Sequence, residues 1–111
     1  MQIDFTQPIL DLQNKPAFMT DAEGRPTTEV ISLRLVVSQA LLLPMQGDDG
    51  GKKYRCFQIA TKIQAEDKPD LSVEDVAFVK ERVGNSHWPP LTVGRAWDLL
   101  DPKPKAVAES A

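Results

Sequence analysis

The longest apolar run of this 111-residue chain is Leu35-Val36-Val37-Ser38-Gln39-Ala40-Leu41-Leu42-Leu43. A bilayer span needs about 20 apolar residues, so this shorter run indicates a helix in a protein core. We predict a helix over about residues 28–43, capped by Thr27 or Thr28. Its apolar residues fall on two stripes, one of Val30, Leu33, Val37, Ala40 and Leu41 and one of Ile31, Leu35 and Leu42. Two stripes indicate packing on two sides, so we expect this helix to be central.

Three further amphipathic helices are predicted, over about residues 52–64, 73–83 and 91–100. Ser72 is expected to cap the second of them, with Asp75 three residues later as the reciprocal partner, and Gly84 to end it. A glycine-rich loop over residues 47–51 precedes the first. The residues expected to face inward are Cys56, Ile59, Ala60 and Ile63, then Val76, Val79 and Val83, and finally Val93, Ala96, Trp97 and Leu100.

The N-terminal segment has a different pattern, because apolar and polar residues alternate over residues 2–19 and are broken by Asn14-Lys15-Pro16. This pattern predicts a β-hairpin over about residues 2–19 with its turn at residues 13–16. Two strands alone are marginal in water, so the hairpin should pack on the helices. The predicted class is α+β, mostly α, with one domain over residues 1–102 and a flexible tail over residues 103–111.

Composition excludes several kinds of protein. The net charge of −3 argues against an overall basic nucleic-acid binder. Cys56 and His87 are the single cysteine and the single histidine of the chain, so a multi-cysteine metal site and a disulfide framework are excluded. Cys56 is expected on the inner face of its helix, where a thiol behaves as a small hydrophobe. We therefore expect no enzyme, no metal and no cofactor.

Four residues are candidates for contact with a partner. Phe78 lies off the apolar stripe of its helix, and Trp88 precedes a proline pair, so each is either an anchor for a protein partner or covered by the hairpin or the tail. Arg55 and Lys62 are two helical turns apart and point the same way. They either contact phosphates or form a solvated face.

Several stretches of the chain resemble small proteins encoded in phage and prophage genomes. Residues 9–16, Ile-Leu-Asp-Leu-Gln-Asn-Lys-Pro, are similar to an opening I-x-D-L-x-G-K-P, although Asn14 stands in place of the glycine and leaves the turn type open. Residues 54–63, 71–76 and 91–100 are similar to later stretches in the same order. The resemblance implies a viral origin and supplies no catalytic residue.

These observations together favour a small non-enzymatic phage protein that acts by binding another protein. It would modulate a host or defence component, or serve as an assembly adaptor or minor virion component. The alternative is a nucleic-acid-associated protein that uses Arg55 and Lys62 on the helix over residues 52–64. The sequence also leaves open that the chain forms a homo-oligomer. The acidic N-terminus does not resemble a secretory signal, so we expect the host cytoplasm or the virion and no membrane association.

Overall fold

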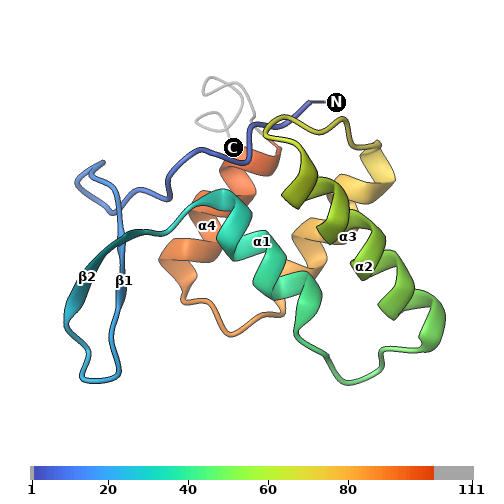
Figure 1. Ribbon diagram of the computed structural model, residues 1–111, viewed down its shortest axis with the longest axis horizontal. Coiled ribbons are helices and arrows are strands. Elements are labelled where there is room, and N and C mark those ends of the chain that lie inside the picture. Colours follow the sequence, from blue (N-terminus) through green and yellow to red (C-terminus); the bar gives the residue numbers. More distant parts are fainter. Residues whose placement is uncertain (1, 102–111) are drawn as a thin grey trace, which may run out of the picture.

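The computed structural model describes residues 2–101 (Figure 1). The expected α+β class, mostly α, is confirmed, whereas the tail predicted over residues 103–111 lies outside the described residues. The elements in chain order are β1 (Phe18–Thr20), β2 (Pro26–Val30), α1 (Leu33–Leu42), α2 (Gly50–Ala65), α3 (Val73–Gly84) and α4 (Pro90–Leu100).

The central position of α1 is confirmed, because it contacts α2, α3 and α4. Its predicted start at Thr28 is wrong, since α1 begins at Leu33 and is capped by Ser32. The Ser32 hydroxyl accepts a hydrogen bond of 3.1 Å from the Leu35 N–H. Residues 26–30 form β2 instead, as befits a run rich in the β-branched residues Thr27, Thr28 and Val30.

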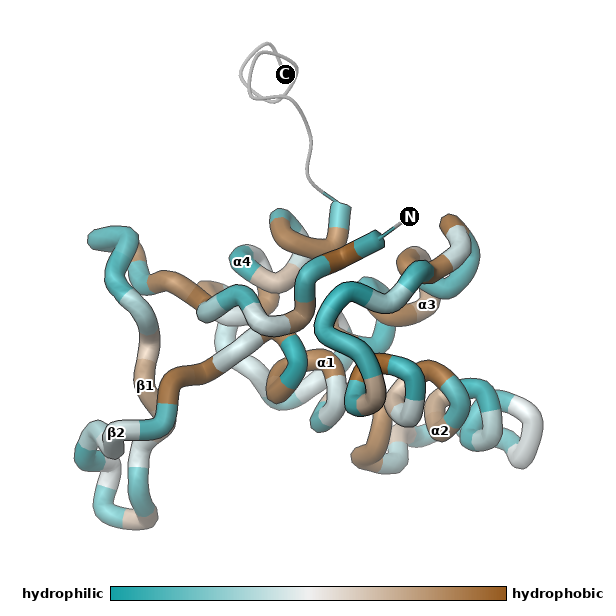
Figure 2. Tube along the Cα trace, turned by 45° about the horizontal axis from the view of Figure 1, so that its top comes forward, coloured by the Kyte–Doolittle hydropathy of each residue, from teal (hydrophilic) through white to brown (hydrophobic). Residues whose placement is uncertain are grey.

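The hairpin also lies elsewhere than predicted. A turn does occur near residues 13–16, where Asn14 adopts a φ of 62° and Leu10 forms an isolated bridge with Pro16. The two-stranded antiparallel sheet, however, is made by β1 and β2. Asp21 begins the loop between them, and its carboxylate accepts hydrogen bonds from the Glu23 and Arg25 N–H groups. The β1–β2 hairpin projects away from the helices in Figure 1, and its loop is largely hydrophilic in Figure 2.

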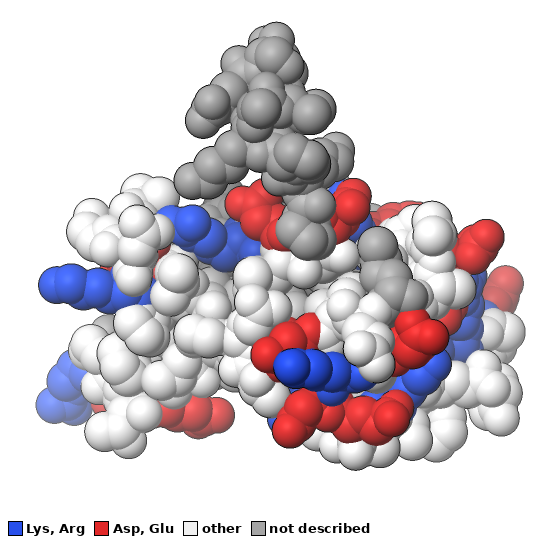
Figure 3. Space-filling model, turned by 90° about the horizontal axis from the view of Figure 1, so that it is seen from above, with Lys and Arg blue, Asp and Glu red and all other residues white. Residues whose placement is uncertain are grey.

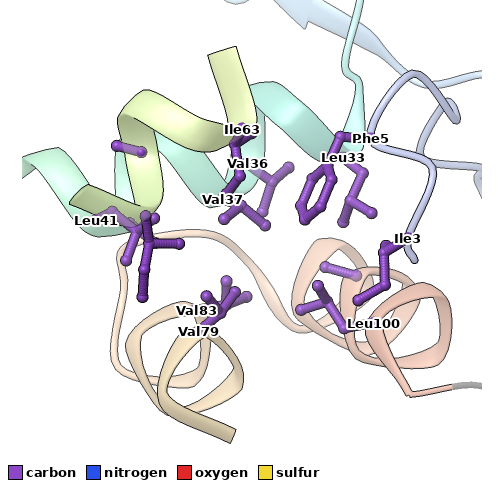
Figure 4. Packing of buried hydrophobic residues seen from close by; sticks show 14 of the residues in the cluster. Ile3, Phe5, Leu33, Val36, Val37, Leu41, Ile63, Val79, Val83 and Leu100 are labelled. Carbon is purple, nitrogen blue, oxygen red and sulfur yellow. The ribbon is translucent and has the colours of Figure 1, made fainter. Parts of the chain in front are cut away.

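The segment before β1 packs into the core instead of forming the predicted hairpin over residues 2–19. Three backbone hydrogen bonds of 2.8–2.9 Å connect Ile9, Ala17 and Ile31 at the base of the hairpin: Ile9 N–H to Ile31 O, Ala17 N–H to Ile9 O, and Ile31 N–H to Ala17 O. Phe5 is fully buried, and its ring points in Figure 4 into a core to which all four helices contribute. The N-terminal segment is therefore part of the domain's core.

The other helices follow the prediction to within two residues, and the inward faces of α2 and α3 are confirmed. α2 begins at Gly50, inside the predicted loop, because the Asp49 carboxylate caps it by accepting from the Lys52 N–H at 2.8 Å. Ser72 caps α3 as expected, through the Asp75 N–H at 3.1 Å. Gly84, the expected C-cap of α3, is instead the last helical residue, and Asn85 is the C-cap.

In α4 the prediction that Trp97 is buried is wrong, since its side chain is 41% exposed. Its ring lies over Gly84, where an added Cβ would come within 3.0 Å of Trp97 Cζ2. The indole N–H donates to the Lys80 carbonyl at 3.0 Å. Trp97 thus lies across the outside of the α3–α4 contact, while Thr92, Ala96 and Leu100 are the buried residues of α4.

A buried ion pair joins the loop after α1 to α3. Arg82 Nη1 lies 2.6 Å from Asp48 Oδ1, and these side chains are only 6% and 4% exposed. The same guanidinium donates through Nη2 to the Leu43 carbonyl at 3.0 Å and through Nε to the Ala40 carbonyl at 3.3 Å. Since the last carbonyls of a helix have no partner within it, Arg82 satisfies acceptors at the end of α1.

This pair predicts a loss of stability in acid. The bond from Arg82, and then the Met45 N–H, lower the pKa of Asp48. A carboxyl whose pKa is lower in the folded state than in the unfolded state stabilises the fold. This contribution is complete above the unfolded-state pKa of about 3.9, and it disappears as the pH falls through the folded-state pKa. Urea unfolding at pH 6 and pH 3 should show a smaller acid-induced loss in Asp48→Asn than in the wild type. Equal losses in the two proteins would contradict this role.

Candidate protein-interaction surface

Phe78, a candidate partner contact, is partly buried and packs against the core. The guanidinium carbon of Arg55 lies 4.4 Å from the centre of its ring, a cation–π contact. Phe78 is thus covered in part by α2. Its ring also lines a polar hollow of about 510 Å³ beside Arg82 and His87.

Trp88, the second aromatic candidate, is also partly buried against the core. It lines a smaller hollow of about 280 Å³ together with Met19 from β1 and Leu43 from the end of α1. Phe78 and Trp88 therefore line separate hollows, with His87 at the edge of both. Neither aromatic is a fully exposed anchor.

Arg55 and Lys62 lie on the same side of α2, and both bond to groups of this chain. Arg55 Nη2 lies 3.3 Å from Asp75 Oδ1, and Lys62 Nζ donates to the Asp70 carbonyl. That side of α2 is therefore turned toward α3 and the segment before it. Figure 3 shows basic side chains beside acidic ones on one face of the molecule, with no extended basic patch.

The most exposed aromatic side chains lie on another side of α2. Tyr54 and Phe57 are 60% and 57% exposed, and their rings stack with centroids 6.1 Å apart and an interplanar angle of 27°. Lys53 and Thr61, each four residues from Phe57, are exposed beside them. We call Lys53, Tyr54, Phe57 and Thr61 the α2 aromatic face. Neither Tyr54 nor Phe57 is among the contact residues predicted from the sequence.

Two exposed leucines lie at the C-terminal end of α1. Arg34, early in α1, donates to the Ile63 and Glu66 carbonyls at the end of α2, so the two helices run antiparallel. The C-terminal end of α1 consequently lies beside the N-terminal half of α2. Leu42 and Leu43 at that end are exposed apolar residues. Leu43 also lines the hollow beside Trp88 and Met19.

A second apolar surface is a groove between α3 and α4, with a volume of about 430 Å³. Val73, Val76, Ala77 and Trp97 line it. Lys80 lies at its edge, where its ammonium is 3.2 Å from Asp101 Oδ2 and 4.9 Å from the centre of a Trp97 ring. Lys80 and Asp101, two of the three charged residues that line the groove, are therefore paired with each other.

Cys56 is not among the residues that line the polar hollow beside His87. Cys56 is buried on the inner face of α2 as predicted, and burial raises the pKa of its thiol, which disfavours the reactive thiolate. Within residues 2–101, no group of three or more His, Cys, Asp or Glu residues could hold a metal ion. No helix within the same residues is long and apolar enough to cross a membrane.

Comparisons with protein-family models, with curated proteins and with solved structures found no match.

Proposed function

We propose that this chain is a small non-enzymatic protein of phage origin that acts by binding another protein through the α2 aromatic face. The observation that carries the proposal is the exposure of the stacked Tyr54 and Phe57 rings. The phage origin rests on the resemblance of residues 9–16 and the later stretches. The binding would modulate a host or defence component or serve virion assembly.

Physical chemistry supports a binding role for these two rings. Aromatic residues are enriched at the centres of protein interfaces, where burying them removes much apolar surface from water. The packing of the domain itself does not need these rings, because Cys56, Ile59, Ala60 and Ile63 supply the buried face of α2. A partner that covers the α2 aromatic face would gain this burial without disturbing the fold.

Removal of both rings should separate binding from stability. In the double variant Tyr54→Ala, Phe57→Ala, we expect the free energy of unfolding to change by no more than about 0.5 kcal/mol for each exposed site. Affinity for the partner should fall on the order of tenfold or more. Urea unfolding and a binding titration with the purified partner measure the two quantities. A large loss of stability, or an unchanged affinity, would contradict the assignment.

Site-specific photocrosslinking tests whether the face is a contact surface in cells. A benzophenone amino acid at position 57 should give one defined protein adduct that survives nuclease treatment. The matched control is Leu12, an exposed apolar residue in the turn before β1. The chain segment just before β1 lies on the opposite side of the molecule from α2 (Figure 1). Similar adducts from both positions, or no adduct from position 57, would contradict the proposal.

The nucleic-acid alternative relied on Arg55 and Lys62. Their bonds to Asp75 and to the Asp70 carbonyl count against it, because these donors would have to leave their partners to reach phosphates. If the alternative holds, the double variant Arg55→Glu, Lys62→Glu should lose a salt-sensitive gel shift. The protein-binding proposal expects no gel shift from the wild-type protein.

A further inference from the structure

The charge of this chain is unevenly distributed. Four of its 13 Lys and Arg residues lie in α2, and none of its 16 Asp and Glu residues does. The rest of the chain therefore carries nine basic and 16 acidic residues, a charge of −7. Thus α2 is a basic helix on an otherwise acidic protein.

Two of the four cations of α2 are available to a partner. Arg55 and Lys62 already bond to Asp75 and to the Asp70 carbonyl. Lys52 and Lys53 are exposed, and their ammonium groups form no ion pair with any residue in the described range 2–101. Both lysines lie in the first turn of α2, immediately before Tyr54.

The available charge and the exposed rings lie together. Lys53 is four residues before Phe57, so their side chains are neighbours on the helix surface. We infer that the α2 aromatic face binds an acidic segment of another protein, with apolar side chains over Tyr54 and Phe57 and carboxylates beside Lys53. Lys52 lines the polar hollow beside Asp48 and adds positive charge to the same end of the helix. The inference rests on the proposed function and adds the chemistry of the partner.

The same charges disfavour two other occupants. A second copy that presented its own α2 would bring together two helices that each carry four cations and no carboxylate, and like charges at a contact reduce affinity. A nucleic acid would find two free lysines on a molecule whose remaining charge of −7 repels phosphate. An acidic, apolar protein segment matches both the rings and the lysines.

Three synthetic peptides test this chemistry directly. Each is an amphipathic helix of about 18 residues, or five turns, with the same apolar stripe. The flanking positions carry Glu in the first peptide, Gln in the second and Lys in the third. Titrated by fluorescence anisotropy against the full chain, the Glu peptide should bind on the order of tenfold more tightly than the Gln peptide, and the Lys peptide most weakly.

Charge reversal provides the matched variant. The double variant Lys52→Glu, Lys53→Glu should fold, because both residues are exposed and acids in the first turn of a helix suit its dipole. It should prefer the Lys peptide to the Glu peptide. Circular dichroism checks the fold, and higher salt should reduce the preference of both proteins.

The outcomes distinguish this inference from the proposed function. The wild-type protein could bind the three peptides with equal affinity, and the double variant Tyr54→Ala, Phe57→Ala could bind none of them. That result would overturn the acidic partner and leave the α2 aromatic face as a binding surface. Binding by none of them would overturn the assignment, and photocrosslinking at position 57 would then decide the proposed function separately. Tighter binding of an oligothymidylate of about 15 nucleotides would overturn the assignment in favour of nucleic acid.

Discussion

Arg82→Ala is expected to lower the free energy of unfolding by about 3–5 kcal/mol, which is a large fraction of the stability of a small domain. The guanidinium is buried and bonds to Asp48 Oδ1, the Leu43 carbonyl and the Ala40 carbonyl. Its removal would leave the Asp48 carboxylate buried beside acceptors at the end of α1 that have also lost a donor. An uncompensated buried charge is among the most damaging changes to a fold.

The matched control is Arg25→Ala. Arg25 also forms ion pairs, with Asp21 and Glu23, but its side chain is 75% exposed. Exposed pairs contribute about 0–1 kcal/mol, so this variant should unfold at nearly the wild-type urea concentration. Arg82→Lys should recover part of the loss, because an ammonium keeps the charge but cannot span three acceptors as a guanidinium does. Equal effects of Arg82→Ala and Arg25→Ala would show that the buried pair does not hold the fold.

Phe5→Ala is expected to cost about 3–5 kcal/mol, because it removes a fully buried ring from the core. The residue lies in an irregular segment, yet its backbone is fixed on both sides. Its N–H donates to the Asp67 carbonyl at 2.9 Å, and its carbonyl accepts from the Arg34 N–H at 3.0 Å. The segment around Phe5 therefore cannot close easily over the cavity that the variant creates.

Phe57→Ala is the control for this experiment, since it removes the same side chain from an exposed position of α2. Its effect on unfolding should stay within about 0.5 kcal/mol. Urea unfolding of the two variants compares the residues directly. If Phe5→Ala unfolded no more easily than Phe57→Ala, the N-terminal segment would not belong to the core as the structure has it.

The helices were predictable where their signals are local. Ser72 caps α3 as expected because its hydroxyl needs only the Asp75 N–H, three residues away. The hairpin was placed wrongly because Pro16 and Asn14 mark a real turn, but the pairing of β1 with β2 competes with it over a longer range. Likewise, residues 28–30, which were assigned from the sequence to the central helix, belong to strand β2.

The buried charge was not predictable, because it depends on two distant parts of the chain. Arg82 lies beside the stripe of Val79 and Val83, where an arginine is usually exposed. It can be buried only because Asp48, 34 residues earlier, meets it in the fold. Trp97 was misjudged for a related reason, since the space for its ring is provided by Gly84 on another helix.

The sequence by itself determines which residues of α2 and α3 face inward, because the 3.6-residue repeat of apolar side chains is a property of each helix alone. Only the tertiary structure decides what becomes of the other sides of α2. Arg55 bonds to Asp75 in α3 and Lys62 to the Asp70 carbonyl before α3, whereas Tyr54 and Phe57 stay exposed. A helical repeat identifies the core face but not the direction from which a neighbour approaches, and that direction determines which surface is left for a partner.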